Sequence, residues 1–504
     1  MGCVKAQELV QSNKPADGPI FLTVKKTARP PASPDSPPPH HKSAQRLGFQ
    51  NKRSPAATAL PRRRLLSSPL LPTQSNHRFD PPSPSLPLLS RMACRATRGL
   101  WNELPADLAY SIARCLRCSV DRFYMSRACR TWKEGLRRLR EDPTIPAPTR
   151  PLPWLLLPYR RVADNPGRRR RQGQRIRFGR FYCVLSHLTH RAQVPLNTGG
   201  ARFFGAYPGG WVFSAQNCRH ALVNLHTPER PPLRLPNVLL RNNRETPVFI
   251  LAATLSAPPV PGNNCVAAAI VVTIPVRFPK KIMIWWLGSQ RPTFHREPHS
   301  AVLDVEDVIY YNDAFYFINR MSDLLVFRPD FQEGAPLEPL QVHREDLSFL
   351  PLFLGGGMMV KNRYLVESRG ELLMVARQIL GPLADTLAFR VFRMTPPPPD
   401  AAHADYSWTE LPALDGRMLF VGRGCSRSYE VADFPGSEER VYFHDECFYN
   451  DEVEMISKYG IRDDREYPCS DNGACWEVHV PGAVNRLYQA LAPSTYSSPV
   501  WFLH

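Results

Sequence analysis

Apolar residues recur at helical spacing in one part of the chain, residues 101–139. Leu108, Ile112 and Leu116 stand four residues apart, which predicts one apolar stripe along a short helix. Ser119 is a candidate N-cap for a second helix, because an acidic residue follows in what would be its first turn. About 40 residues of this kind bury too little apolar surface to be a comfortable domain alone. We therefore expect the helical pair to dock its apolar stripe on another surface.

After residue 150 the pattern changes to short apolar runs separated by turn-forming residues. Three such runs in 307–327 are joined by two polar breaks, as in a β-meander, and 211–225 and 364–375 repeat the scheme. Many short strands with tight turns indicate a sandwich, a barrel or a propeller. Recurrence at roughly 40–50 residues favours a propeller of about seven blades. Further strands are predicted at 154–157, 418–421, 441–443, 476–480 and 500–503.

Residues 1–98 have a different composition, with 16 prolines, 16 Lys and Arg, and only four acidic residues. They show no sustained period, so we expect a disordered segment. Myristoylation at Gly2 is disfavoured because Ala6 stands where the motif requires Ser or Thr. Two alternatives stay open for this segment: it resembles an organelle transit peptide, or translation begins at Met92.

The positive charge is unevenly distributed along the chain. Residues 1–180 carry a net charge of +24, whereas residues 181–504 carry −5. The overall pI of about 9.6 therefore does not argue for nucleic-acid binding by the folded body. Arg168–Arg171 fits a nuclear-import or nucleic-acid-binding segment, but a solvated loop of charge is the favoured interpretation because few aromatic residues lie nearby. Nucleic acid is not an expected partner.

Twelve cysteines are scattered without the regular spacing of a disulfide framework, which favours reduced thiols in the cytoplasm or nucleus. An organelle is the alternative location if residues 1–91 act as a transit peptide. Residues 1–10 lack the apolar core of a secretory signal. The longest apolar run, 265–274, is too short to span a bilayer, so membrane association is not expected.

Candidate chemical motifs are incomplete. Cys115 and Cys118 have CxxC spacing, but no second pair is present, and two ligands do not close a tetrahedral metal site. Gly422 and Gly424 lack the third glycine of a dinucleotide-binding fingerprint and indicate a turn between strands. Neighbours in the polar cluster 444–447 would point to opposite faces of a strand. We predict no catalytic residues, no cofactor, no metal site and no enzyme activity.

The helical stretch resembles the F-box. The resemblance is carried by Leu104-Pro105, an amphipathic helix, a short link, and Cys129-Arg130-x-Trp132. It implies binding to a Skp-type adaptor and, through it, to a cullin in a cullin–RING ubiquitin ligase. The residues that this resemblance places against the adaptor are Leu104, Pro105, Leu108, Ile112, Leu116 and Trp132.

A second resemblance covers most of the C-terminal part of the chain. It is carried in order by Gly209-Gly210-Trp211, 223–236, 408–411, 416–446 and Pro499-Val500-Trp501-Phe502. These segments resemble the plant F-box family whose C-terminal part is a KIB-type β-propeller, also known as domain of unknown function 295. The resemblance implies the propeller fold and no catalytic residue.

Together these observations predict a mainly β protein with a small α-helical module. The expected parts are a disordered segment at 1–98, F-box-like helices at 99–140, a Pro- and Arg-rich linker at 141–180 and a propeller at 181–504, with a start near 150 as the alternative. The expected function is substrate receptor of a Skp–cullin–F-box ubiquitin ligase, acting on an unknown protein target. The alternative is a stand-alone propeller scaffold without ligase association.

Overall fold

A computed structural model describes about two thirds of the chain beyond residue 103. The described ranges are 104–144, 151–157, 176–195, 201–216, 219–241, 244–260, 263–273, 277–289, 293–295, 304–331, 340–352, 357–381, 384–398, 405–444, 473–478, 484–488 and 497–504. The predictions for 1–98 and for Arg168–Arg171 lie outside these ranges.

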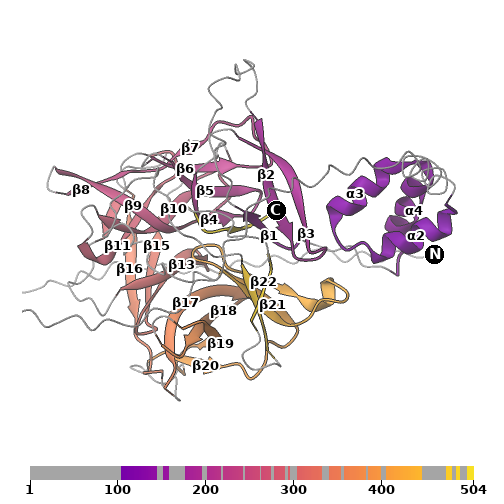
Figure 1. Cartoon of the computed structure of the whole chain (residues 1–504). Coiled ribbons are helices and arrows are strands. Elements are labelled where there is room, and N and C mark those ends of the chain that lie inside the picture. The colour runs from indigo at the N-terminus through magenta and orange to yellow at the C-terminus, as the bar shows by residue number, and fades with distance from the viewer. Residues whose placement is uncertain are drawn as a thin grey trace, which may run out of the picture. The chain divides into compact units, whose positions relative to one another are not determined.

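The helical module consists of three helices, α2 (Ala106–Cys115), α3 (Ser119–Ala128) and α4 (Arg130–Glu141) (Figure 1). The single second helix that the sequence predicts is interrupted at Cys129, which is fully extended with φ −162° and ψ 179°. The break lets α3 and α4 each contribute side chains to one small core. The N-cap of α3 is Cys118, one residue before the predicted Ser119. None of the described helices has the length and apolar character needed to cross a membrane.

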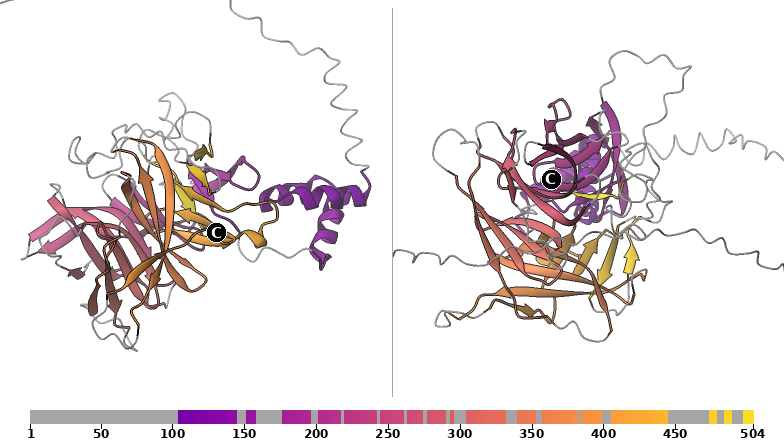
Figure 2. Two further views of the ribbon diagram at one scale, coloured as in Figure 1. Left: turned by 90° about the horizontal axis from the view of Figure 1, so that it is seen from below. Right: turned by 90° about the vertical axis from the view of Figure 1, so that its left-hand side faces the viewer.

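The strands form six sheets within the described ranges, numbered here in chain order (Figures 1 and 2). The first sheet contains β1 (Trp154–Leu157), β2 (Ile176–Cys183), β3 (Leu188–Pro195) and β26 (Val500–Phe502). The second contains β4 (Arg202–Tyr207), β5 (Trp211–Gln216), β6 (Arg219–Asn224) and β7 (Leu233–Arg234). The third contains β8 (Val238–Arg241), β9 (Arg244–Leu255), β10 (Val266–Thr273), β11 (Arg277–Trp286) and β12 (Thr293–His295).

The C-terminal half supplies the other three sheets. The fourth contains β13 (Val305–Tyr311), β14 (Ala314–Asn319), β15 (Leu324–Pro329) and β16 (Val342–Leu347). The fifth contains β17 (Met359–Ser368), β18 (Glu371–Ile379), β19 (Thr386–Thr395) and β20 (Ser407–Glu410). The sixth contains β21 (Arg417–Val421), β22 (Arg427–Glu430), β23 (Arg440–Phe443), β24 (Ala474–Glu477) and β25 (Val484–Arg486).

This arrangement is the predicted β-propeller, with six blades in place of the expected seven. The third and sixth sheets have five strands each. The sixth sheet extends from Arg417 to Arg486, far beyond the roughly 45-residue repeat that the division assumed. The predicted meander is confirmed as β13–β15, and its first turn has positive φ at Asn312 (46°) and Asp313 (59°), as two-residue hairpin turns require.

Apolar clusters lie between neighbouring sheets around the ring. The second and third sheets share one cluster, and so do the third and fourth, the fourth and fifth, and the fifth and sixth. A larger cluster joins the first sheet to both the second and the sixth. Each sheet is therefore buried on both faces, which explains why strands such as β10 and β14 are buried along their whole length.

The ring is closed by the C-terminal strand β26, which pairs antiparallel with β1 in the first sheet. Trp501 lies opposite Leu155 and is fully buried. Its indole N–H donates to the carbonyl of Val421 on β21, with an N···O distance of 2.9 Å. One side chain of the first sheet is thus hydrogen-bonded to the sixth sheet.

A buried carboxylate provides a second link between sheets. Asp307, at the start of β13, accepts backbone N–H groups from Leu365 at 2.8 Å and from Gly424 at 2.6 Å. Gly424 has φ +69°, and a Cβ there would lie 2.5 Å from the carbonyl oxygen of Ala253 on β9. The turn between β21 and β22, which the sequence predicts at these glycines, therefore fits closely against the third and fourth sheets.

Replacing Trp501 with alanine should strongly destabilise the propeller, because it removes a fully buried ring and a link between the first and sixth sheets. Loss of a buried Trp typically costs about 3–5 kcal/mol. Urea unfolding followed by circular dichroism measures the change. Leu380→Ala is the matched control, since that side chain is 65% exposed and should cost less than about 0.5 kcal/mol. Equal unfolding midpoints for the two variants would contradict this account of ring closure.

Candidate interaction surface

The apolar residues of α2 divide into two sets. Ala109 and Ala113 are fully buried and form the module's core with side chains of α3 and α4. Leu108 is 52% exposed, and Ile112 is half-buried and lies outside that core. The predicted stripe is therefore not the one that α2 packs inward. The inward face uses alanine, because a small side chain lets another helix approach closely.

That helix is α4, and the closest approach is at Gly135. A Cβ at Gly135 would lie 2.7 Å from the backbone carbonyl carbon of Ala109 and 2.7 Å from the backbone nitrogen of Tyr110. These distances are too short for any real Cβ contact, so only glycine fits at this crossing. The sequence contains this signal as a lone glycine inside a helical pattern, which often has a packing reason.

The six predicted adaptor-binding residues take different positions in the module. Leu104, Leu116 and Trp132 are half-buried and pack against its core. Pro105 is exposed and occupies the N-cap position of α2, where its carbonyl accepts the backbone N–H of Ala109 at 3.0 Å. Pro105 and Leu108 are therefore the two predicted residues that are exposed without forming the core.

Two further exposed aromatic residues lie on α3, and the sequence patterns did not single them out as a pair. Phe123 is 52% exposed and Tyr124 is 59% exposed, with their ring centroids 5.8 Å apart in an edge-to-face arrangement. The guanidinium of Arg127 lies 5.5 Å from the Phe123 ring centroid. Large apolar side chains that stay exposed near one another mark interaction surfaces more often than isolated ones do.

The outer face of α4 is charged. Arg137 forms ion pairs with Glu134 at 2.6 Å and with Glu141, and Arg138 reaches Asp107 on α2 at 2.6 Å. Hydrogen bonding to Arg137 lowers the pKa of Glu134 to about 2. Such exposed pairs contribute little to stability. They give the module a polar side beside its exposed apolar residues.

The other candidate motifs separate in the structure. Cys115 is exposed whereas Cys118 is buried, so the CxxC pair does not act as one unit. Of the polar cluster 444–447, only His444 lies within the described ranges. Burial lowers the pKa of His444 to about 3, and its ring stacks on Trp501 at a centroid distance of 5.1 Å. This histidine is part of the core.

The propeller identifies the family. The profile of the KIB1-4 beta-propeller matches residues 181–466, more than half of the chain. The chain belongs to the KIB1-4 beta-propeller family. The matched range includes four of the five segments in which the sequence resembles a KIB-type propeller, and Pro499–Phe502 falls beyond it. The KIB1-4 propeller is completed from outside the matched range, because β1 and β26 belong to its first sheet.

Comparison with other proteins adds little to this assignment. No curated protein matches the sequence. Among solved structures, a chain from S. cerevisiae Dbp5 bound to Nup159, Gle1, IP6 and ADP is 11% identical, with a TM-score of 0.27, over 61% of this chain and 69% of that one. The beta-propeller domain of Cps50 (Swd1), titled Myceliophteria thermophila, is 13% identical with a TM-score of 0.27 over 68% and 98%. Neither similarity carries a functional argument.

Replacing Gly135 with alanine should loosen the helical module that precedes the KIB1-4 propeller. Alanine raises helix propensity by about 1 kcal/mol, whereas overpacking costs about 1–3 kcal/mol, and here the Cβ would meet backbone atoms. We therefore expect a net loss. Hydrogen exchange in the full chain should show faster exchange along α2 and α4.

Ser111→Ala is the control for this prediction, because Ser111 is exposed on α2 and its replacement raises helix propensity without a clash. Its exchange should stay as slow as in the wild type, or become slower. If Gly135→Ala protected α2 as well as Ser111→Ala does, the close helix crossing would be refuted.

Proposed function

We propose that this protein is the substrate-recognition subunit of a Skp–cullin–F-box ubiquitin ligase. In this proposal the α2–α4 module binds a Skp-type adaptor, and through it a cullin, while the propeller binds the protein target. The observation that carries the proposal is the position of Pro105 and Leu108, which are exposed at the start of α2 although their sequence context resembles the F-box.

The module's own stability does not require these side chains, since its core is made by other residues. Complete burial of a leucine contributes about 1.5–3 kcal/mol relative to leaving it exposed. An amphipathic helix that lays such residues into a groove gains this free energy on binding. Leu108 and the half-buried Ile112, one turn apart on α2, have the spacing of such anchors.

The role of the KIB1-4 propeller in this proposal is to hold a target near the ubiquitin-transferring enzymes. Such a receptor contributes proximity and orientation and needs no cofactor or catalytic residue of its own. The target is a protein whose identity depends on the loops of the propeller.

The alternative is a propeller scaffold whose helical module does not bind the adaptor. The two proposals differ in what co-purifies with the full chain. The ligase proposal expects a Skp-type adaptor and a cullin, whereas the scaffold expects neither.

Changing Pro105 and Leu108 together to alanine should weaken adaptor binding more than tenfold, because interface anchors typically contribute about 2 kcal/mol or more and each decade corresponds to about 1.4 kcal/mol. The fold should be unchanged, since both residues are exposed. Isothermal titration calorimetry with purified adaptor measures the affinity, and circular dichroism checks the fold.

Leu380→Ala is the matched control, because it removes an exposed leucine at the end of β18 in the propeller and should leave adaptor affinity unchanged. Equal affinity of the double variant and the wild type would remove Pro105 and Leu108 from the interface. Failure of the wild-type chain to bind any Skp-type adaptor would favour the scaffold.

A further inference from the structure

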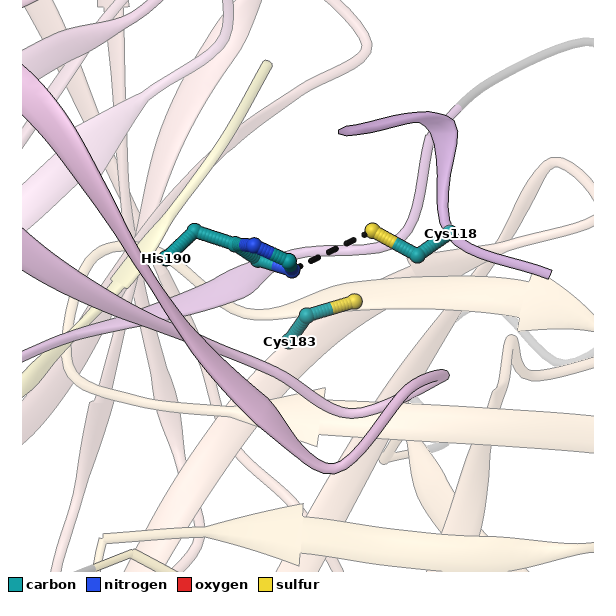
Figure 3. A group of neighbouring side chains, drawn as sticks. All are labelled: Cys118, Cys183 and His190. Atoms are coloured by element: carbon teal, nitrogen blue, oxygen red, sulfur yellow. Dashed lines mark hydrogen bonds between the residues drawn. The ribbon is translucent and has the colours of Figure 1, made fainter. Parts of the chain in front are cut away.

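Three buried side chains with metal-binding atoms converge where the start of α3 meets the first sheet. Cys118 is the N-cap of α3, Cys183 is the last residue of β2, and His190 lies on β3. The two sulfur atoms and a histidine nitrogen all lie within 4.8 Å of one another. Figure 3 shows Cys118 and His190 pointing toward each other with Cys183 beside them.

The hairpin of β2 and β3 places two of these residues on one face. Cys183 is paired with Leu188, and His190 is the second residue after Leu188 along β3. Directly paired residues of antiparallel strands point to the same face, and so do alternate residues of one strand. The side chains of Cys183 and His190 are therefore diagonal neighbours. The tight turn between the strands is closed by the His187 N–H donating to the Cys183 carbonyl at 2.9 Å.

The third residue comes from far away in the sequence. The Cys118 sulfur lies 3.3 Å from Nε2 of His190, across 72 positions of the chain. The Trp154 ring stands against the His190 imidazole at a centroid distance of 5.3 Å and helps to orient it. All three residues are buried, with Cys118 and Cys183 each only 1% exposed.

These separations suit a tetrahedral zinc ion. With Zn–S of about 2.3 Å and Zn–N of about 2.0–2.1 Å, tetrahedral ligand atoms lie roughly 3.5–3.8 Å apart. The observed S···N distance of 3.3 Å is already close to this value. Little movement would be needed to admit the ion.

Backbone amides are also arranged to favour sulfur as thiolate. The N–H groups of Val120 and Asp121 hydrogen-bond to Cys118, and those of Leu185 and Ser186 hydrogen-bond to Cys183. In each case the donors are the second and third residues after the cysteine. Hydrogen bonding from Cys118 and from Ser186, together with these amides, lowers the pKa of Cys183 to about 5. Thiolate is the form of cysteine that binds metals.

We propose that Cys118, Cys183 and His190 bind a structural zinc ion, with a water molecule as the fourth ligand. Two thiolates and one imidazole are the soft and intermediate donors that select zinc over magnesium or calcium. Binding replaces the thiol protons of the cysteines with the metal, and protons are released to solvent. The Ser186 hydroxyl, 3.5 Å from Nε2 of His190, is close enough to accompany the water.

A zinc ion at this place would join the helical module to the propeller by coordination bonds. Within the described ranges, another link beside it is a hydrogen bond from Arg117 to the carbonyl of Gly436 at 2.8 Å. The ion would hold the start of α3 against the β2–β3 hairpin. This site does not depend on the proposed function, because zinc binding is measured without an adaptor or a target.

The test is zinc binding by the full chain, purified with reduced thiols and measured by elemental analysis and by competition with a chromogenic chelator. The wild type and Cys115→Ser should each hold one zinc per chain, because Cys115 is exposed and outside the cluster. Cys118→Ser, Cys183→Ser and His190→Gln should each bind zinc more than about a hundredfold more weakly, since each loses a direct ligand.

Cobalt replacement in the wild type keeps the test decisive if a variant fails to fold. A thiolate-to-cobalt charge-transfer band is expected, and chelation of the metal should accelerate hydrogen exchange at the start of α3 and in the β2–β3 turn. The proposal is overturned if the wild type binds no zinc, if Cys183→Ser binds it as tightly as Cys115→Ser, or if mass spectrometry finds a Cys118–Cys183 disulfide in the purified chain.

Discussion

The structure depends first on the pairing of β26 with β1, which closes the ring of six sheets. Every sheet is covered by its neighbours, so an open ring would leave the large cluster around the first sheet exposed to water. Trp501 contributes to this closure twice, through its buried ring and through its hydrogen bond to Val421. The family profile ends at residue 466, so the strand that completes the propeller lies beyond it.

The helical module is organised by one close contact, the crossing of α2 and α4 at Gly135. Because small residues occupy the inside of this crossing, larger apolar residues such as Leu108 are left outside. The packing of the module and its capacity to bind a partner therefore have the same origin. A core built on the leucine stripe would have buried the residues that the F-box resemblance places against an adaptor.

The cluster of Cys118, Cys183 and His190 bears on the same question, because it lies where the module meets the first sheet. A receptor that must present a target at a defined distance benefits from a fixed connection between its two binding parts. Coordination bonds would provide that connection with three side chains. The exposed Cys115, three residues away, shows that CxxC spacing alone did not identify the site.

Local patterns in the sequence determined the type of most elements, because turn residues and apolar alternation act over a few positions. The hairpin at Asn312-Asp313 and the turn at Gly424 follow from such residues. The number of sheets, the break at Cys129 and the inward face of α2 were decided by packing between elements. No local propensity specifies those contacts. Most clearly, Cys118 meets His190 only because the folded chain brings together residues 72 positions apart.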